Sequence, residues 1–191
     1  MSLTVEKCLQ AWTNSLKQMN SKADIVFFGD SLTYYGDFSS VYPDKVVCNL
    51  GLRGDTIQGM IGRIEQVRVL APKKVFLMAG INDVSCCSYS GFSQLYEKLI
   101  ISLLSIISDC ELFIQGLLPV NDVDYSISCN NNQITSCNAI ISHIADRMNL
   151  KFLNLFSPYA INGILPKTIT KDGLHLNLEA YDKWYNLVKA Y

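Results

Sequence analysis

The chain has 191 residues, of which 49% are hydrophobic and 17% charged, and its formal net charge is -1 at pH 7. A chain of this size and composition can close one sizeable core, so we expect a single domain over residues 1–191. The near-neutral charge and the scattered Lys and Arg argue against nucleic acid or a membrane surface as a partner and favour a small molecule. The longest apolar run, residues 99–107, is interrupted by serines and is far shorter than the roughly 20 residues that a bilayer requires.

The amino-terminal residues and the cysteines bear on where the protein works. The start, MSLTVEKCLQAW, lacks a basic segment followed by an apolar one, so no secretory signal is predicted. The seven cysteines form an odd set without CxxC or CxH spacing, which favours reduced thiols over a disulfide framework or a metal site. We therefore expect a cytoplasmic protein without a bound metal.

Apolar segments typical of strands alternate along the chain with longer segments of helical periodicity. The predicted strands are 23–29, 45–51, 73–80, 110–119 and 151–156. The predicted helices are 55–70, 91–109, 132–149 and 177–190. Near-continuous apolar strands separated by helices indicate a parallel sheet that is covered on both faces. The predicted fold class is therefore α/β, a three-layer α/β/α sandwich around a five-stranded parallel sheet.

The residues that follow the predicted strands are candidates for chemistry. Ligands of such sheets bind outside the carboxyl ends of the strands, so these junctions should meet at one edge. The junctions are Gly29-Asp30-Ser31, Gly51-Leu52-Arg53-Gly54-Asp55, Gly80-Ile81-Asn82-Asp83 and, beyond a loop after the last strand, KDGLHLN with Asp172 and His175. The topology thus brings a serine, a glycine amide, an asparagine amide and an Asp/His pair together.

This set of residues suits acyl transfer. A serine hydroxyl becomes a nucleophile when an imidazole takes its proton and a carboxylate fixes the imidazole's tautomer, roles that Ser31, His175 and Asp172 can fill. Attack on a carbonyl creates an oxyanion, which needs preorganised hydrogen-bond donors. For these donors we expect the backbone N–H groups of Ser31 and Gly54 and the side-chain amide of Asn82.

Asp172 and His175 are predicted to act as a unit. They are three residues apart, and Gly173 between them eases the bend that places both side chains on one side. Asn177 is expected to cap the last helix, with Glu179 in its first turn, which would anchor the preceding histidine loop to a rigid element.

Other polar residues at the junctions have structural interpretations. Asp30 is expected to fasten its loop as a hydrogen-bond acceptor. Asp55 precedes TIQ and is expected to cap its helix, with Gln58 in the box position. Asp83 is interpreted as structural for similar reasons. For Arg53 we expect a solvated side chain, with contact to an anionic substrate as the alternative.

Competing catalytic groups are poorly supported. His143 lies amid helical periodicity without a carboxylate or cysteine set around it, which leaves His175 as the credible base. Cys86 and Cys87 follow GIND and are a rival nucleophile, but neither occupies a strand-to-helix turn. Two histidines far apart in the chain do not make a metal ligand set.

Four short blocks, in this order, carry a resemblance to a known family: GDSL at 29–32, GLRGDT at 51–56, GIND at 80–83 and DGLH at 172–175. They resemble the four blocks of the SGNH, or GDSL, hydrolase superfamily, and the resemblance spans most of the chain. The segment NLGLRGDTIQGMIGRI is similar to the platelet-activating-factor acetylhydrolase-like branch, whose members remove short acyl groups. The chain departs from many members at Leu176, where they have proline after the histidine.

The resemblance implies a flavodoxin-like topology and assigns the same residue roles. Ser31 would be the nucleophile and first oxyanion donor, Gly54 and Asn82 the other two donors, and Asp172 and His175 the rest of the triad.

We therefore expect a cofactor-free serine esterase that forms an acyl-serine intermediate. Short acyl esters are the favoured substrates, acetyl above all, and by resemblance an O-acetylated sugar such as sialic acid. Residues 119–132 and 157–170 are long enough to shape specificity. Tyr34, Tyr35 and Phe38 either line a substrate wall or pack in the core.

Two alternatives stay open. A thioesterase or lysophospholipase acting on longer acyl chains would share every catalytic residue. A binding domain with a hydrolase fold and no turnover belongs to another class, and it is disfavoured because each catalytic residue type is present. No motif bears on the oligomeric state, or on whether the chain is one domain of a larger enzyme.

Overall fold

The computed structural model describes residues 3–18 and 22–191. Its centre is a five-stranded sheet whose neighbouring strands all run parallel, in the order β2-β1-β3-β4-β5. The strands are β1 (Ile25–Gly29), β2 (Val47–Gly51), β3 (Lys74–Met78), β4 (Glu111–Gln115) and β5 (Lys151–Leu153). This is the flavodoxin-like order, in which ligands bind at the switch point between β1 and β3. The predicted α/β class and topology are confirmed.

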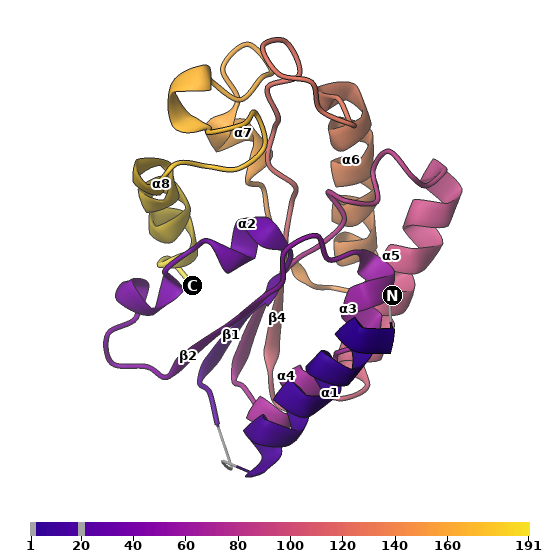
Figure 1. The fold of residues 1–191 in the computed structure, drawn as a ribbon, viewed down its shortest axis with the longest axis vertical. Helices are drawn as coiled ribbons and strands as arrows, with labels where there is room; N and C mark the ends of the chain where they lie inside the picture. Colours follow the sequence, from indigo (N-terminus) through magenta and orange to yellow (C-terminus); the bar gives the residue numbers. More distant parts are fainter. Residues whose placement is uncertain (1–2, 19–21) are drawn as a thin grey trace.

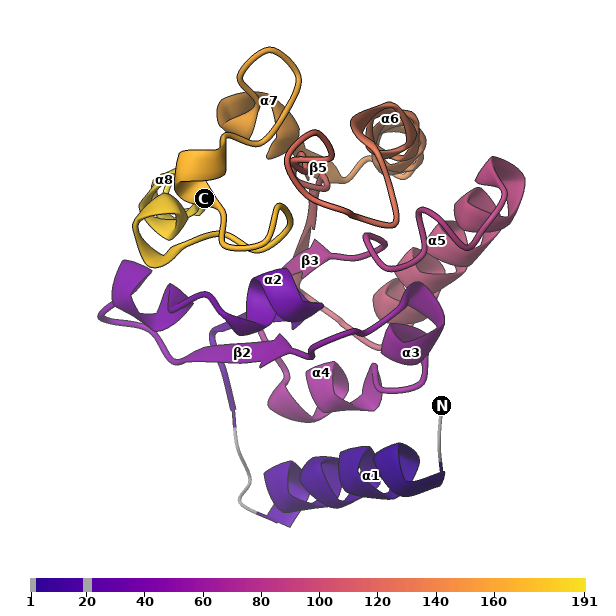
Figure 2. The same cartoon turned by 45° about the horizontal axis from the view of Figure 1, so that its top comes forward.

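Helices cover both faces of the sheet (Figures 1 and 2). They are α1 (Leu3–Gln18), α2 (Ser31–Tyr34), the 3-10 turn η1 (Phe38–Val41), α3 (Ile57–Ile61), α4 (Glu65–Leu70), α5 (Tyr89–Leu104), α6 (Asn131–Arg147), α7 (Phe156–Tyr159), the 3-10 turn η2 (Lys167–Ile169) and α8 (Leu178–Val188). Helices α3 to α6 lie on one face, with α1 packed outside α4, whereas η1 and α8 lie on the other. None of the helices over the described residues has the length and apolar character that a membrane crossing requires.

A ladder of aromatic rings ties the C-terminal helix to the sheet. Phe27, Phe76 and Phe113 share one register across β1, β3 and β4, so their rings point to the same face and stack with centroids 4.7 Å apart. Phe38 of η1 stacks on Phe27 at 3.8 Å, and Trp184 of α8 meets Phe38 edge-on at 5.3 Å. These buried contacts hold α8 against one face of the sheet.

The strands lie where the apolar pattern predicts them, but they are shorter. All five residues of β1 are buried, which is why this strand is apolar throughout rather than alternating. The predicted strand 110–119 ends in the sheet at Gln115, and the predicted strand 151–156 ends at Leu153 because Phe156 already begins α7.

The helix predicted over 55–70 is wrong as a single element. The structure has α3 and α4, separated at residues 62–64. Arg63 lies in this break, and its side chain turns inward and is buried under the sheet edge. Helix α1 was not predicted. Leu9 on α1 is buried, and Trp12 and Leu16 pack against the core, so this helix adds a layer outside α4.

Candidate active site

Ser31 stands at the turn where β1 passes into α2. Asp30 is the N-cap of α2, and its Oδ1 accepts a hydrogen bond from the Leu32 N–H at 2.9 Å. The prediction that Asp30 fastens this loop is therefore confirmed. Ser31 follows as the first residue of the helix and is 6% exposed. The cap fixes the backbone that carries the serine hydroxyl.

Ser31, His175 and Asp172 lie in one hydrogen-bonded row. Ser31 Oγ is 2.9 Å from His175 Nε2, and His175 Nδ1 is 2.7 Å from Asp172 Oδ2. The other carboxylate oxygen of Asp172 accepts the backbone N–H groups of Leu174 at 3.0 Å and of His175 at 2.8 Å. Burial raises the pKa of Asp172, but the hydrogen bonds from His175 and Leu174 outweigh it and hold the pKa below its usual value. The carboxylate is therefore ionised at neutral pH beside the imidazole.

The loop that carries Asp172 and His175 is held by local hydrogen bonds. Thr170 Oγ1 accepts the N–H of Gly173 at 2.9 Å and donates to the carbonyl of His175 at 2.8 Å. Gly173 has φ +85°, a left-handed conformation that favours glycine. Its carbonyl accepts the N–H of Asn121 at 2.7 Å, so the connection from β4 to α6 packs against the histidine loop.

Asn177 caps α8 as predicted. Its side-chain oxygen accepts the Ala180 N–H at 3.0 Å, and its amide donates to the Thr168 carbonyl at 2.9 Å. Glu179 lies in the first turn of α8. The cap joins the two ends of the histidine loop to the helix that the aromatic ladder holds in place.

Gly54 and Asn82 lie on the two loops that flank Ser31. Gly29 at the end of β1 is in register with Gly51 of β2 and Met78 of β3, so both loops leave the sheet beside the serine turn. Gly54 is exposed and has φ +70°. The side-chain amide of Asn82 donates one N–H to the Asp55 carbonyl at 2.7 Å, and an amide nitrogen carries a second N–H.

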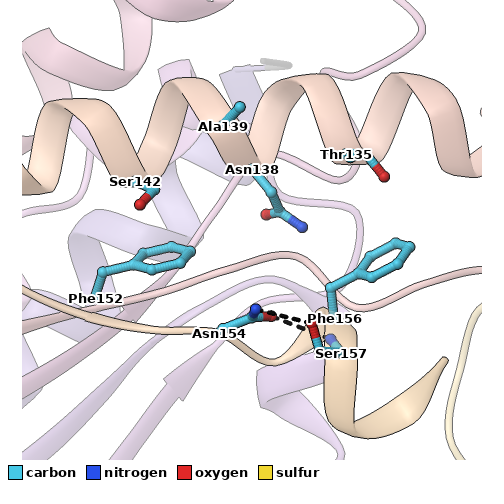
Figure 3. Close-up of a pocket in the computed structure, with 8 residues that line it drawn as sticks. All are labelled: Thr135, Asn138, Ala139, Ser142, Phe152, Asn154, Phe156 and Ser157. Atoms are coloured by element: carbon cyan, nitrogen blue, oxygen red, sulfur yellow. Dashed lines mark hydrogen bonds between the residues drawn. The ribbon is translucent and has the colours of Figure 1, made fainter.

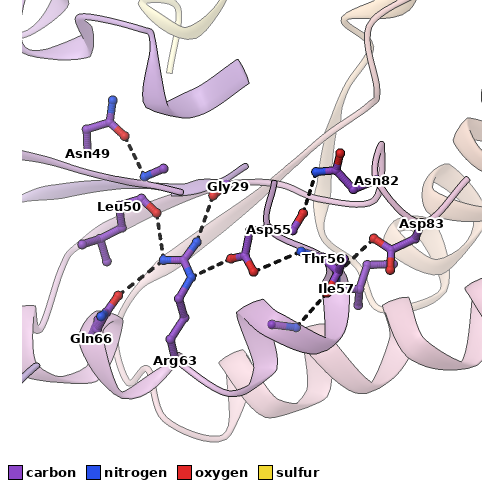
Figure 4. Close-up of polar contacts among 12 residues, drawn as sticks. Gly29, Asn49, Leu50, Asp55, Thr56, Ile57, Arg63, Gln66, Asn82 and Asp83 are labelled. Atoms are coloured by element: carbon purple, nitrogen blue, oxygen red, sulfur yellow. Dashed lines mark hydrogen bonds and ion pairs between the residues drawn. The ribbon is translucent and has the colours of Figure 1, made fainter. Parts of the chain in front are cut away.

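The prediction that Asp55 caps the following helix is wrong. Thr56 is the N-cap of α3, and its Oγ1 accepts the Gly59 N–H at 3.1 Å. Asp55 instead forms an ion pair with Arg63, with Oδ2 and Nε 2.6 Å apart and both side chains buried (Figure 4). A buried guanidinium requires a carboxylate partner more strongly than a helix end requires a charged cap. The structural interpretation of Asp83 agrees with the structure, since its carboxylate accepts the Ile57 N–H at 3.1 Å.

The rim of the site is aromatic and basic. The ring of Tyr35 meets His175 edge-on with centroids 5.5 Å apart, and the guanidinium of Arg53 lies 5.8 Å from the centre of the Tyr35 ring. Arg53 is exposed, as predicted, and Tyr34, whose ring meets that of Tyr35 edge-on, is 51% exposed. Phe38 packs in the core and does not line the site.

The rival groups lack the surroundings of a catalytic base or nucleophile. His143 is exposed on α6, and Cys86 is exposed with its thiol 3.8 Å from Ser85 Oγ. Burial raises the pKa of the Cys87 thiol, which disfavours the thiolate that a cysteine nucleophile needs. Over residues 3–18 and 22–191, no three His, Cys, Asp or Glu side chains gather as metal ligands would.

A hollow that the sequence did not predict lies between α6 and the β5–α7 segment (Figure 3). Its volume is about 300 Å³ and its walls include Phe152, Phe156 and Asn138. The amide of Asn138 is already paired with the backbone of Leu117, at 2.7 and 2.9 Å, and Asn154 is paired with Ser157. The hollow therefore offers little polar recognition and contains none of the predicted site residues.

A flavodoxin-like sheet with a serine, a histidine and an aspartate in one hydrogen-bonded row at its switch point is typical of a serine hydrolase. The sequence model of the GDSL-like Lipase/Acylhydrolase family matches residues 27–183. The chain belongs to this family and is a carboxylic ester hydrolase. The resemblance stated from the four sequence blocks is confirmed. None of the curated proteins matches the chain.

Solved structures share the fold over nearly the whole chain. A structure from Streptococcus pneumonia described as a platelet activating factor has a TM-score of 0.83 and 23% identity, covering 100% of this chain and 99% of that one. A GDSL-like lipase from Bacteroides thetaiotaomicron has a TM-score of 0.77 and 23% identity, with 97% and 95% covered. The acetyl xylan esterase AlAXEase has a TM-score of 0.73 and 21% identity, with 87% and 98% covered. At these identities the likeness concerns the fold.

Proposed function

We propose that Ser31, His175 and Asp172 are a catalytic triad and that the protein hydrolyses short-chain esters through an acyl-serine intermediate. The observation that carries the proposal is the hydrogen-bonded row itself, 2.9 Å from Ser31 Oγ to His175 Nε2 and 2.7 Å from His175 Nδ1 to Asp172 Oδ2. In this geometry one imidazole nitrogen accepts a proton from the serine while the other donates to the carboxylate.

Each step of the reaction has a residue to perform it. His175 Nε2 takes the proton of Ser31 Oγ as the oxygen attacks the acyl carbon, and the carbonyl oxygen becomes an oxyanion. Backbone N–H groups of Ser31 and Gly54 and the free N–H of Asn82 are the proposed donors to it. His175 then gives the proton to the departing alcohol, and the same sequence with water releases the acid.

Replacing the nucleophile tests the mechanism directly. Ser31→Ala should lower kcat on 4-nitrophenyl acetate by about 10⁴-fold or more, because the nucleophile is lost, while the thermal midpoint changes little. Ser136→Ala is the matched control, because Ser136 is half-buried on α6 and its hydroxyl donates to the Asn132 carbonyl. A fluorophosphonate probe should label the wild type and not Ser31→Ala. Near-normal turnover by Ser31→Ala would remove this serine from the mechanism.

For the acyl group we propose acetyl. The compact chain leaves little room for a long acyl tunnel, and structural neighbours include an acetyl xylan esterase and an acetyl-xylooligosaccharide esterase. Comparing nitrophenyl acetate, butyrate and octanoate should show the highest kcat/KM for acetate. A clear preference for octanoate, or for acyl-CoA, would instead support a lysophospholipase or thioesterase.

For the alcohol we propose an O-acetylated sugar that carries a carboxylate, such as sialic acid. The support is the rim, where Arg53 lies over Tyr35 and Tyr35 lies against His175. Among the ion pairs found over the described residues Arg53 takes part in none, so its charge is available to an anion. A guanidinium suits a carboxylate because it presents parallel N–H donors.

Arg53→Met separates charge recognition from catalysis. It should lower kcat/KM for O-acetyl sialic acid by about 10-fold and leave that for neutral acetylated xylo-oligosaccharide within about twofold. Equal losses on both sugars would show that Arg53 does not read the charge. Higher activity of the wild type on the neutral sugar would favour a xylan-type substrate.

We also propose that the protein works in a reducing compartment, the cytoplasm. The support is that the cysteines described, Cys48, Cys86, Cys87, Cys110, Cys129 and Cys137, carry free thiols. Thiol titration of the denatured protein taken directly from cells should find them reduced, and recovery of disulfides would contradict the proposal.

A further inference from the structure

Each of the three proposed oxyanion donors borders a buried carboxylate. The pairs are Asp30–Ser31, Gly54–Asp55 and Asn82–Asp83. The three aspartates are 0, 7 and 5% exposed. The donors therefore sit on a layer of acidic side chains that solvent scarcely reaches.

One buried arginine connects this layer to the sheet. Arg63 is 2% exposed and pairs with Asp55 at 2.6 Å. Its two terminal nitrogens donate to the main-chain oxygens of Gly29 and Leu50, each at 2.9 Å. The guanidinium also lies 4.4 Å from the centre of the Phe28 ring. Figure 4 shows this guanidinium between the ends of β1 and β2 and the carboxylate of Asp55.

The same connections continue to the donor loops. The main-chain oxygen of Asp55 accepts the side-chain amide of Asn82 at 2.7 Å, which orients the second N–H of that amide. The Asp55 N–H donates to the Leu52 carbonyl at 3.2 Å, and the Leu52 N–H donates to Gly29 at 3.0 Å. Arg63 thus contacts Asp55, the residue that joins the loop of Gly54 to Asn82. It also contacts Gly29, where the serine turn starts.

Arg63 also supplies positive charge to the acidic layer. Burial raises the pKa of Asp30 and of Asp55, and the attraction of Arg63 lowers both. An ionised carboxylate beneath the donors would repel a developing oxyanion, and the positive charge of Arg63 opposes this repulsion.

We propose that Arg63, with Asp55, is a positioning residue that holds the Gly54 and Asn82 donors in register with Ser31. The inference rests on the proposed function, because it concerns the same oxyanion. If so, loss of the Arg63–Asp55 pair lowers the rate of the chemical step more than it lowers the stability of the fold.

Two variants separate positioning from stability. Arg63→Lys keeps the charge but cannot reach both main-chain oxygens together with Asp55. The double variant Arg63→Met with Asp55→Leu replaces the whole ion pair by apolar groups, an exchange that often leaves a fold as stable as before. Arg68→Met is the control, since Arg68 is exposed and pairs with Glu65 on the surface of α4.

The measurements are kcat and KM on 4-nitrophenyl acetate, the rate of fluorophosphonate labelling and the thermal midpoint. We expect kcat and the labelling rate to fall about 10-fold in Arg63→Lys and about 100-fold in the double variant, with KM within about twofold, because small displacements of donors cost much in rate. Arg68→Met should match the wild type.

Three results would overturn the inference. They are a near-wild-type kcat in the folded double variant, a change in KM alone, and failure of both variants to fold, which would make the pair a requirement of the whole fold. A wild type whose hydrolysis does not depend on Ser31 would instead refute the proposed function, and the two failures are therefore distinguishable.

Discussion

The carboxyl group of Asp30 is buried in the fold, and it also accepts the hydrogen bond that caps α2. Its Oδ1 accepts the Leu32 N–H, its Oδ2 has no hydrogen-bond partner, and the side chain is 0% exposed. Burial raises its pKa from 3.8 to about 7, while the bond from Leu32 lowers it and the neighbouring Asp55 and Asp83 raise it further. Asp30→Asn retains an oxygen for the cap and removes the ionisation.

The direction in which pH changes the stability follows from the pH at which the folded and unfolded chains lose the Asp30 proton. The unfolded chain loses the Asp30 proton near pH 4, whereas the folded chain keeps it to about pH 7. Between these values the folded state binds more protons, so this residue's contribution to the free energy of unfolding falls as the pH rises. At about 1.4 kcal/mol per unit, the fall is about 2 kcal/mol from pH 5 to pH 7 and about 3 kcal/mol from pH 5 to pH 8, where it is nearly complete.

Urea unfolding at pH 5, 6, 7 and 8 measures the effect. The free energy of unfolding of Asp30→Asn relative to the wild type should increase by about 3 kcal/mol between pH 5 and pH 8. Asp146→Asn, at an exposed position on α6, is the control for the same change of residue type. A difference for Asp30→Asn that stays constant within about 0.5 kcal/mol would mean that Asp30 is already ionised at pH 5, and the reasoning would be wrong.

Three further substitutions probe the site and its support. Asp172→Asn should lower kcat on nitrophenyl acetate by about 10⁴-fold with little change in thermal midpoint, because an amide favours the wrong imidazole tautomer; retention of a tenth of the activity would contradict the triad. Gly173→Ala should destabilise the protein by about 1–3 kcal/mol and lower kcat, because φ is +85° and the new Cβ would lie 2.9 Å from the Asn121 carbonyl oxygen; unchanged urea midpoint and kcat would refute this. Trp184→Ala should cost about 3–5 kcal/mol in urea unfolding, because the side chain is buried and its Nε1 donates to Gln115 at 2.7 Å; a loss below about 1 kcal/mol would show that the site collapses around the gap.

The sheet was predictable because its strands are covered on both faces. Burial on two faces selects apolar residues at successive positions, and β1 is buried at all five. The ends were less predictable. Residues 116–119 continue the apolar pattern after β4, since a chain leaving a covered sheet edge passes through the same core.

The helices were harder to predict where a side chain overrides helical periodicity. Residues 55–70 have one continuous pattern, but Arg63 must turn inward to reach Asp55 and two strand ends, and the helix breaks there. Nothing in a single sequence shows that an aspartate and an arginine eight positions apart are both buried. The N-cap assignment of Asp55 failed for the same reason.

The candidate site was predictable from topology. Residues at the carboxyl ends of parallel strands converge, so Ser31 and the loops of Gly54 and Asn82 were expected at one edge, and the short spacing of Asp172 and His175 set their contact. The catalytic roles of these residues remain predictions for the substitutions above. The buried arginine beneath them had no sequence signal apart from its place in the family-like segment 49–64.

The hydrogen bond between Ser31 and His175 joins positions 144 residues apart, and the hydroxyl of Tyr181 on α8 reaches back to the Leu32 carbonyl at 2.7 Å. A ribosome therefore exposes the proposed nucleophile long before it has synthesised the proposed base. Under this mechanism, nascent chains and fragments truncated before Asp172 would not hydrolyse esters. Ester cleavage would begin only when the segment from Asp172 through α8 has been synthesised and has packed against the serine turn.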